Sequence, residues 1–383
     1  MDFELNETQR LLKETVAEFT RRRIVPVARQ NDIEERFPAD IVKEMGELGF
    51  FGGTIPEAYG GAGLDYVSYA VLMEEISKGC SSVRTVLSVQ LSLVAAPILQ
   101  WGSEEQKRKH LPKLAAAEWL GCFGLTEPDA GSDAQHIKTF AEKTADGWRL
   151  NGSKIWISNG GVAQVALIIV QTDRENPRRM AAFLVETDTP GFSSRDIHGK
   201  LGLRSSNTAE LILDGVEVPD SAMLGGVGDG FKVAMSALDC GRLSVGAACV
   251  GIGQASLDAS VAYARERHSC GKPIAAHQMV QDMIARMAVD IEAARLLVYR
   301  AAELKNAGEP SARETCIAKY FASEMAQRCA NDAIQVHGGM GYSNEYPVER
   351  YMRDARAATI YEGTSQIQKL IISGFETGIR AIG

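Results

Sequence analysis

The sequence contains no motif that would bind a metal ion. Its seven cysteines are dispersed and form no CxxC pair, its six histidines are scattered, and HExxH does not occur. These absences exclude the common zinc sites, which need clustered Cys or His ligands. An odd number of dispersed cysteines is typical of reduced core thiols in a reducing compartment. We therefore expect no metal ion and no disulfide framework.

An excess of basic residues is also missing. The 383 residues include 41 Lys and Arg against 49 Asp and Glu, a formal net charge of −8. Nucleic-acid binders usually carry a basic face, so small molecules or other proteins are the expected partners. We find no stretch of the roughly 18 apolar residues that a membrane span needs. The start of the chain, from Met1 to Glu4, lacks the pattern of a signal peptide, and we expect a soluble, cytoplasmic protein.

The nucleotide-binding motifs GxGxxG and GxxxxGK[ST] are absent too. The nearest approach, Gly251-Ile252-Gly253, is not followed by the third glycine and lies inside a helical pattern. We interpret these glycines as helix-packing positions. Any nucleotide cofactor must be held in another way.

Apolar and charged residues, at 45% and 23%, are present in ordinary globular proportions, and three patterns divide the chain. Residues 1–118 show helical spacing of apolar residues, residues 119–225 change to β-rich runs, and residues 226–383 return to helical periodicity. The order predicts an α+β fold, mostly α, with an N-terminal helical domain, a middle β domain and a C-terminal helical bundle. It excludes a Rossmann enzyme, in which strands and helices alternate.

Two local patterns can be tested against a structure. Asn151-Gly152, between apolar runs at 148–150 and 154–157, predicts a hairpin turn, and Asp214-Gly215 predicts another. In the C-terminal part, one face of a long helix is predicted to carry Met283, Met287, Ile291, Ala294 and Val298.

Polar residues gather in three segments where a core would need apolar ones: 123–133, 156–161 and 361–368. The first is dense in glycine, hydroxyl and carboxyl groups, which suits either a ligand or an ordinary turn. In the second, Trp156 either walls a planar ring or belongs to the core. In the third, Glu362 precedes a predicted helix start, where Ser365 and Gln368 form a capping-box pattern.

Glu362 taken alone is either a solvated surface acid or a catalytic base. A helix N-terminus lowers the pKa of a carboxyl group, whereas an apolar pocket raises it. A base that acts on a weakly acidic C–H group benefits from the raised pKa. The sequence leaves open which effect is larger.

Four segments together resemble the acyl-CoA dehydrogenase family: 123–133, 156–161, His337 to Tyr342 and Tyr361 to Gln368. The resemblance covers essentially the whole chain, in the family's order and spacing. It implies an N-terminal helical domain, a middle β-barrel-like domain and a C-terminal four-helix bundle. It also implies a homotetramer with one FAD in each subunit.

The resemblance implies that Glu362 is the catalytic base. In the family this residue removes the α-proton of an acyl thioester while the β-hydrogen leaves as hydride to flavin N5. The backbone N–H of the base and a ribityl hydroxyl of FAD donate to the thioester oxygen. Some relatives carry the base directly before the arginine that is Arg242 here. This chain has Gly241 there, which leaves Glu362 without a rival.

The resemblance also implies two sets of FAD contacts. Residues expected around the isoalloxazine ring are Phe123, Leu125, Thr126, Gly131, Ser132, Trp156 and Ser158. Residues expected to reach the diphosphate and adenine from a neighbouring subunit are Arg267, Gln278, Gln335 and Gly339, and further cofactor contacts are expected from Thr364 and Gln366. Cys270 departs from the family, which commonly has Phe at this position.

For the substrate, the resemblance implies contacts of Asp239 and Arg242 near the pantetheine, and of Ser132, Tyr361 and Gly363. An Asp239–Arg242 ion pair on one helix turn is an alternative interpretation. Arg84, with Ser88 four residues later, resembles the arrangement in glutaryl-CoA dehydrogenases, where the arginine binds the distal carboxylate. The alternative for Arg84 is a surface or interface salt bridge.

The expected activity is FAD-dependent α,β-dehydrogenation of a short, branched or compact acyl-CoA, in acyl-CoA catabolism, with electron-transfer flavoprotein as acceptor. Alternatives are a glutaryl-CoA-type enzyme, with or without decarboxylation, and a dehydrogenase of carrier-protein-linked acyl groups. An acyl-CoA oxidase would typically carry a further helical domain. A catalytically dead scaffold would have no use for Glu362.

Overall fold

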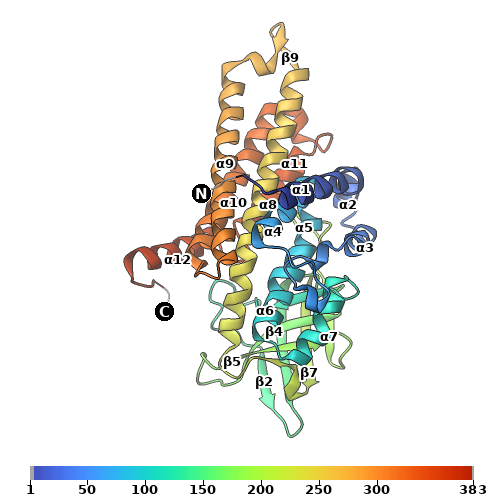
Figure 1. Ribbon diagram of the computed structural model, residues 1–383, viewed down its shortest axis with the longest axis vertical. Helices are drawn as coiled ribbons and strands as arrows, with labels where there is room; N and C mark the ends of the chain where they lie inside the picture. The colour runs from blue at the N-terminus through green and yellow to red at the C-terminus, as the bar shows by residue number, and fades with distance from the viewer. Residues whose placement is uncertain (1–3, 382–383) are drawn as a thin grey trace.

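The computed structural model describes residues 4–381, so Met1 to Phe3 of the N-terminal segment considered above lie outside it. The sheet domain lies at one end of the molecule, and helices from both ends of the chain form the remainder (Figure 1). The predicted fold class, α+β and mostly α in three parts, is confirmed.

The first part is helical. Its helices are α1 (Glu7–Phe19), η1 (Thr20–Ile24), α2 (Val25–Ile33), α3 (Ala39–Glu47), η2 (Phe50–Gly52), η3 (Glu57–Tyr59), α4 (Tyr66–Gly79), α5 (Ser81–Ser88), η4 (Val89–Ala95), α6 (Ala96–Trp101) and α7 (Glu104–Ala115). The segments α4 and α5 are buried along almost their whole length, because α8 of the third part packs against them.

The second part is a sheet. Its strands are β1 (Gly121–Gly124), β2 (Phe140–Lys143), β3 (Trp148–Ser158), β4 (Val165–Gln171), β5 (Met180–Glu186), β6 (Phe192–Asp196), β7 (Thr208–Val218) and β8 (Met223–Leu224), with η5 (Asp220–Ala222) before β8. They follow the order β6-β7-β3-β2-β4-β5-β8, and β1 pairs with β4 in parallel. A separate apolar core, which includes Leu150, Phe183 and Leu211, fills the sheet.

The third part is a helical bundle. Its elements are α8 (Gly230–Glu266), the short hairpin β9 (His268–Ser269) and β10 (Lys272–Pro273), η6 (Ile274–Ala276), α9 (Gln278–Asn306), α10 (Ala312–His337), η7 (Gly338–Tyr342), α11 (Val348–Ala358) and α12 (Ser365–Thr377). Helices α8, α9 and α10 run along one another, with the β9 hairpin at the end remote from the sheet (Figure 1). On α9, Met287, Ile291, Ala294 and Val298 are buried as predicted, and Met283 is half-buried.

The two predicted hairpin turns are wrong. Strands β3 and β7 run without interruption through Asn151-Gly152 and Asp214-Gly215, which lie opposite each other as a β-bulge. Gly215 adopts a left-handed φ of 67°, and its N–H donates to Oδ1 of Asn151 at 2.8 Å. Turn-forming residues are also suited to a bulge, so the dipeptides alone do not distinguish the two.

The expectation that no segment is long and apolar enough for a membrane span is also wrong. Two helical segments, Ser81–Trp101 and Gly230–Glu266, reach that length and hydropathy. However, 89% and 72% of their apolar windows are buried inside the protein. A helix that is apolar all round is expected in the core of a large protein as well as in a membrane.

The glycines of α8 serve helix packing, as predicted. A Cβ on Gly251 would overlap the carbonyl oxygen of Glu74 on α4, and one on Gly253 would lie 2.8 Å from Sδ of Met325 on α10. Glycine therefore allows the backbones of α8 and α4 to approach each other and leaves room for a side chain of α10.

We expect Gly251→Ala to lower the thermal unfolding midpoint of the FAD-loaded protein by a few degrees, because overpacking costs about 1–3 kcal/mol. Gly374→Ala is the matched control, since a Cβ there has no neighbour closer than 3.6 Å. Equal midpoints for the two variants would contradict the packing role of Gly251.

Candidate active site

Glu362 lies in the turn between α11 and α12, in a strained backbone conformation. Its φ of 54° is left-handed, which is rare for a residue other than glycine, and Gly363 follows with a φ of 90°. Nε2 of Gln368 donates to the carbonyl oxygens of Glu362 and Gly363, both at 3.1 Å. Nζ of Lys319, on α10, donates to the same Gly363 oxygen at 2.7 Å. Buried donors from two helices therefore hold the turn.

The predicted capping box at α12 is wrong. The residue that caps the helix is Thr364, whose Oγ1 accepts from the N–H of Ile367 at 3.2 Å. Ser365 instead donates to Glu324 at 2.6 Å, and Gln368 supports the strained turn. A Thr-Ser pair offers two capping hydroxyls, and tertiary contacts select between them.

The carboxyl group of Glu362 packs against α8 at Gly241. A Cβ on Gly241 would overlap Oε2 of Glu362, so the carboxyl group occupies the space that a side chain at position 241 would fill. Oε2 is buried and has no hydrogen-bond partner among the described residues. Burial raises the pKa of Glu362 to about 7, while Arg84, Lys319 and Arg242 oppose the rise. Burial is therefore the larger effect on the pKa, and Glu362 is not a solvated surface acid.

Three buried cations surround this carboxyl group: Arg84 on α5, Arg242 on α8 and Lys319 on α10, which are 1%, 6% and 0% exposed. Within residues 4–381, none of them forms an ion pair with a carboxylate, and Nε of each arginine lacks a partner. Burying an unpaired cation is costly, which makes this cluster a candidate for binding negative charge.

Arg84 is not in a surface salt bridge, because it is almost completely buried. Its Nη2 donates to the hydroxyl oxygen of Tyr361 at 2.9 Å, next to the candidate base. Burial raises the pKa of Tyr361 to about 12, so this hydroxyl stays protonated near neutral pH. The hydroxyl of Ser88 accepts from Ser244 on α8 at 2.7 Å rather than from Arg84.

Asp239 and Arg242 do not pair with each other. Asp239 interacts with Lys305 at the end of α9 and accepts from the hydroxyl of Thr315 at 2.6 Å. Arg242 is free to face the carboxyl group of Glu362. The predicted alternative of a local ion pair is therefore wrong.

A buried ion pair between Lys154 and Glu127 holds the loop that follows β1. Nζ of Lys154, on β3, lies 2.7 Å from Oε1 of Glu127 and donates to the carbonyl of Leu125 at 3.1 Å. The N–H of Ile155 donates to the carbonyl of Thr126 at 2.9 Å. Phe123 and Leu125 are buried, and Gly131 and Ser132 are exposed at the far end of the loop. This loop is more than an ordinary turn, since buried charges hold it on the sheet.

Trp156 projects from the sheet next to this loop. It is 58% exposed and has a left-handed φ of 63°, so it is not a core tryptophan. Ser158, two residues on, is half-buried. An exposed indole in a strained conformation indicates a platform for a flat ligand.

The remaining predicted cofactor residues lie elsewhere in the chain. Thr364 and Gln366 start α12, beside the base, whereas Arg267 and Gln278 flank the β9 hairpin at the end of the bundle remote from the sheet (Figure 1). The C-terminal turn of α10, with Gln335, lies near them, because His337 stacks on Tyr263 of α8 at 4.4 Å. Within a single chain, Arg267, Gln278 and Gln335 therefore do not lie near Trp156.

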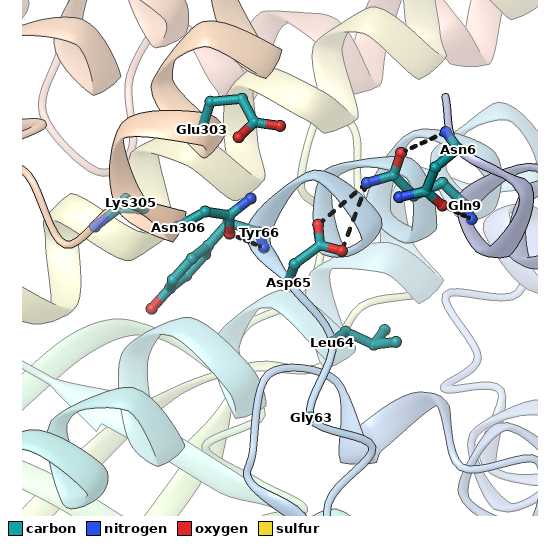
Figure 2. Close-up of a pocket in the computed structure, with 9 residues that line it drawn as sticks. All are labelled: Asn6, Gln9, Gly63, Leu64, Asp65, Tyr66, Glu303, Lys305 and Asn306. Atoms are coloured by element: carbon teal, nitrogen blue, oxygen red, sulfur yellow. Dashed lines mark hydrogen bonds between the residues drawn. The ribbon is translucent and has the colours of Figure 1, made fainter. Parts of the chain in front are cut away.

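A polar depression at the junction of α1, α4 and α9 is not part of this site (Figure 2). Nε2 of Gln9 donates to Asp65, and the N–H of Tyr66 donates to Asn306 at 2.7 Å. The side chain of Lys305 points away from the depression, toward Asp239. The polar groups here largely satisfy one another.

Comparison with known proteins decides the family. The chain matches the N-terminal, middle and C-terminal domains of acyl-CoA dehydrogenase over residues 6–118, 122–216 and 228–375. This chain belongs to the acyl-CoA dehydrogenase family. It is 45% identical to the short-chain specific acyl-CoA dehydrogenase of Rattus norvegicus, over 97% of this chain and 90% of that protein. It is also 45% identical to the glutaryl-CoA dehydrogenase of Desulfococcus multivorans, over 99% of both.

Solved structures agree with this assignment. A glutaryl-CoA dehydrogenase in complex with glutaryl-CoA superimposes with a TM-score of 0.96 at 45% identity, covering 100% of this chain and 98% of that one. A chain described as electron transferring flavoprotein of Acidaminococcus fermentans gives 0.97 at 43%, covering 98% and 100%. A glutaryl-CoA dehydrogenase of Mycobacterium smegmatis in complex with FADH2 gives 0.95 at 36%, covering 99% and 97%.

Acyl-CoA dehydrogenases are FAD enzymes that oxidise a CH–CH bond of an acyl-CoA, and this chain has the residues that FAD needs. Trp156 presents an open aromatic face, and a Cβ on Gly131, Gly338 or Gly339 would meet no atom within 4 Å. Such open glycines let a ligand approach the backbone closely. The residues present therefore fit the cofactor of the acyl-CoA dehydrogenases.

The two donors that hold the turn of Glu362, Lys319 and Gln368, were not identified from the sequence. Lys319 lies on the buried face of α10, between Cys316 and Ala322. A lysine among apolar residues of a buried helix face is unusual, and this pattern in the sequence could have indicated a functional residue. Gln368 was interpreted only as a capping residue.

We expect Gly241→Ala to slow flavin reduction by an acyl-CoA by at least ~10-fold, because the new Cβ displaces the carboxyl group of Glu362. FAD content and thermal midpoint should change little, since alanine favours a helix interior. Stopped-flow absorbance measures the rate, and Gly246→Ala on the same helix is the control. A wild-type rate in Gly241→Ala would refute the close packing of base and helix.

Proposed function

We propose that this protein catalyses FAD-dependent α,β-dehydrogenation of an acyl-CoA with a short or compact acyl chain. The observation that carries the proposal is Oε2 of Glu362, which is buried against Gly241 and has no hydrogen-bond partner among residues 4–381. A structural carboxylate in such a place would be paired, whereas a base awaiting a proton needs a free oxygen.

In this proposal Glu362 removes the α-proton. A pKa of about 7 leaves a substantial fraction ionised near neutral pH and makes it a stronger base than an ordinary carboxylate. The strained turn fixes the direction of the Glu362 N–H, which donates to the thioester oxygen as negative charge develops there. Arg84, Arg242 and Lys319 add positive charge around this region. FAD, when bound, accepts the β-hydrogen and its two electrons at N5.

The other predicted residues fall into groups in this scheme. The flavin platform consists of Phe123, Leu125, Thr126, Gly131, Ser132, Trp156 and Ser158, and the substrate contacts are Ser132, Asp239, Arg242, Tyr361 and Gly363. Arg267, Gln278, Gln335 and Gly339 contact FAD of a neighbouring subunit, because they lie at the end of the bundle remote from the sheet. We therefore propose a homotetramer, with Thr364 and Gln366 as further cofactor contacts.

For the electron acceptor we propose electron-transfer flavoprotein. The support is the likeness to the acyl-CoA dehydrogenase family, which implies this acceptor, and one chain of the same fold comes from a structure described as electron transferring flavoprotein of Acidaminococcus fermentans. A compact acyl chain is supported by the likeness to short-chain acyl-CoA dehydrogenase.

Replacing Glu362 by Gln should reduce the rate of flavin reduction by butyryl-CoA by at least ~10²-fold while FAD binding is retained, because the amide cannot accept the α-proton. Anaerobic mixing followed by visible flavin absorbance measures the rate. Glu217→Gln, an exposed carboxylate paired with Arg149, is the control. Undiminished reduction in Glu362→Gln would exclude this residue as the base.

A glutaryl-CoA-type activity is the second candidate, and the buried Arg84 favours it. This guanidinium has no carboxylate partner among residues 4–381 and lies beside Tyr361. A carboxylate at the distal end of the acyl chain would supply the missing counter-ion.

We expect Arg84→Ala to reduce kcat/KM for glutaryl-CoA by at least ~10²-fold and that for butyryl-CoA far less, because only the first substrate has a distal charge. Steady-state kinetics with both thioesters tests this, and Arg84→Lys should recover part of the glutaryl activity. Equal losses for both substrates would indicate a structural role. Release of CO2 with glutaryl-CoA as the preferred substrate would displace our first proposal.

A further inference from the structure

Lys319 is a buried cation whose role in the reaction can be defined more closely. It is 0% exposed in the middle of α10, and no carboxylate of the described residues pairs with it. Lysine is rarely buried unless its charge is compensated by a partner, since desolvation disfavours the ammonium form.

A hydrogen bond connects Lys319 to the turn that carries the base. Its Nζ donates to the carbonyl of Gly363 at 2.7 Å, directly after Glu362. Glu362 and Gly363 both have left-handed φ values, and such a turn persists only where surrounding contacts hold it. Gln368 donates to the same carbonyl at 3.1 Å, so Lys319 is the charged member of a pair of donors.

We propose that Lys319 is a positioning residue for the dehydrogenation: its ammonium group holds the Gly363 carbonyl and, through its charge, favours the ionised form of Glu362. This inference rests on the proposed function, in which Glu362 is the base. A neutral side chain that donates a hydrogen bond would hold the carbonyl equally well. A cation that did not donate to the carbonyl would not hold the turn. The two effects can therefore be separated by mutation.

The electrostatic part of the inference depends on every group that faces the base. These groups are Tyr69 from α4, Arg84 from α5, Arg242 from α8, Lys319 from α10 and Tyr361 from the turn itself. Cys249 of α8 and Cys316 of α10 interact with Lys319. Burial raises the pKa of Glu362 to about 7 and lowers that of Lys319 to about 8. Lys319 is thus predominantly protonated at the pH where Glu362 loses its proton, so its charge acts when the base ionises.

The test measures anaerobic flavin reduction by butyryl-CoA in single-turnover experiments as a function of pH. The FAD-loaded variants are Lys319→Gln, which keeps a donor without charge, Lys319→Met, which keeps neither, and Lys319→Arg, which keeps both. In the wild type the rate should rise with pH through the base's pKa of about 7, because only the carboxylate accepts a proton.

We expect the midpoint of this profile to move upward by about one pH unit in the Gln and Met variants and to stay in place in the Arg variant. The plateau rate at high pH should remain within about threefold of wild type for Gln and fall by at least ~10-fold for Met, because Met removes the Lys319 donor and leaves Gln368 alone to hold the Gly363 carbonyl. Lys200→Gln is the matched control, a partly buried lysine in the sheet domain that also donates to a carbonyl.

An unchanged midpoint in Lys319→Gln would overturn the inference, and this variant decides the question even if Lys319→Met does not fold. A midpoint that moves equally in Lys200→Gln would also overturn it. Failure of the wild type to be reduced by any acyl-CoA would instead contradict the proposed function.

Discussion

The site depends on one close approach, that of the Glu362 carboxyl group to the backbone of α8 at Gly241. Because position 241 has no side chain, Oε2 of Glu362 reaches a buried position against α8, and burial raises the pKa of the carboxyl group to about 7. The approach also requires the left-handed turn, since a regular helix continuing from α11 would direct residue 362 elsewhere. The glycine, the strained turn and the shifted pKa are parts of a single arrangement.

Long-range contacts tie that arrangement to the first helical part and to the sheet domain. Arg353 of α11 pairs with Asp32 of α2 at 2.6 Å and donates to the carbonyl of Leu201 at 3.1 Å. The neighbouring Asp354 accepts from the N–H of Leu203 at 2.6 Å. These bonds join the three parts of the chain a few residues before the base. The helix that leads to Glu362 is therefore anchored to the sheet domain that carries Trp156.

Structural predictions from the sequence were confirmed where the residue pattern is periodic or recurs in several segments. The helical face of α9, the packing glycines of α8 and the three-part fold are of this kind. Predictions from a single dipeptide were wrong, because Asn151-Gly152 and Asp214-Gly215 suit a bulge as well as a turn. The capping box at Ser365 was wrong for a similar reason, as two adjacent hydroxyls compete for the cap.

The sequence by itself was enough to place Glu362 in a family motif and to exclude a rival base at position 241, which is a glycine. Both conclusions need only the type of residue at a given position. The sequence could not say whether Glu362 was ionised, whether Arg84 was paired or whether Trp156 was exposed. Each of these depends on burial and on charges contributed by helices that are hundreds of residues apart, such as α5 and α10. Electric fields and desolvation act through space, so only the folded chain shows them.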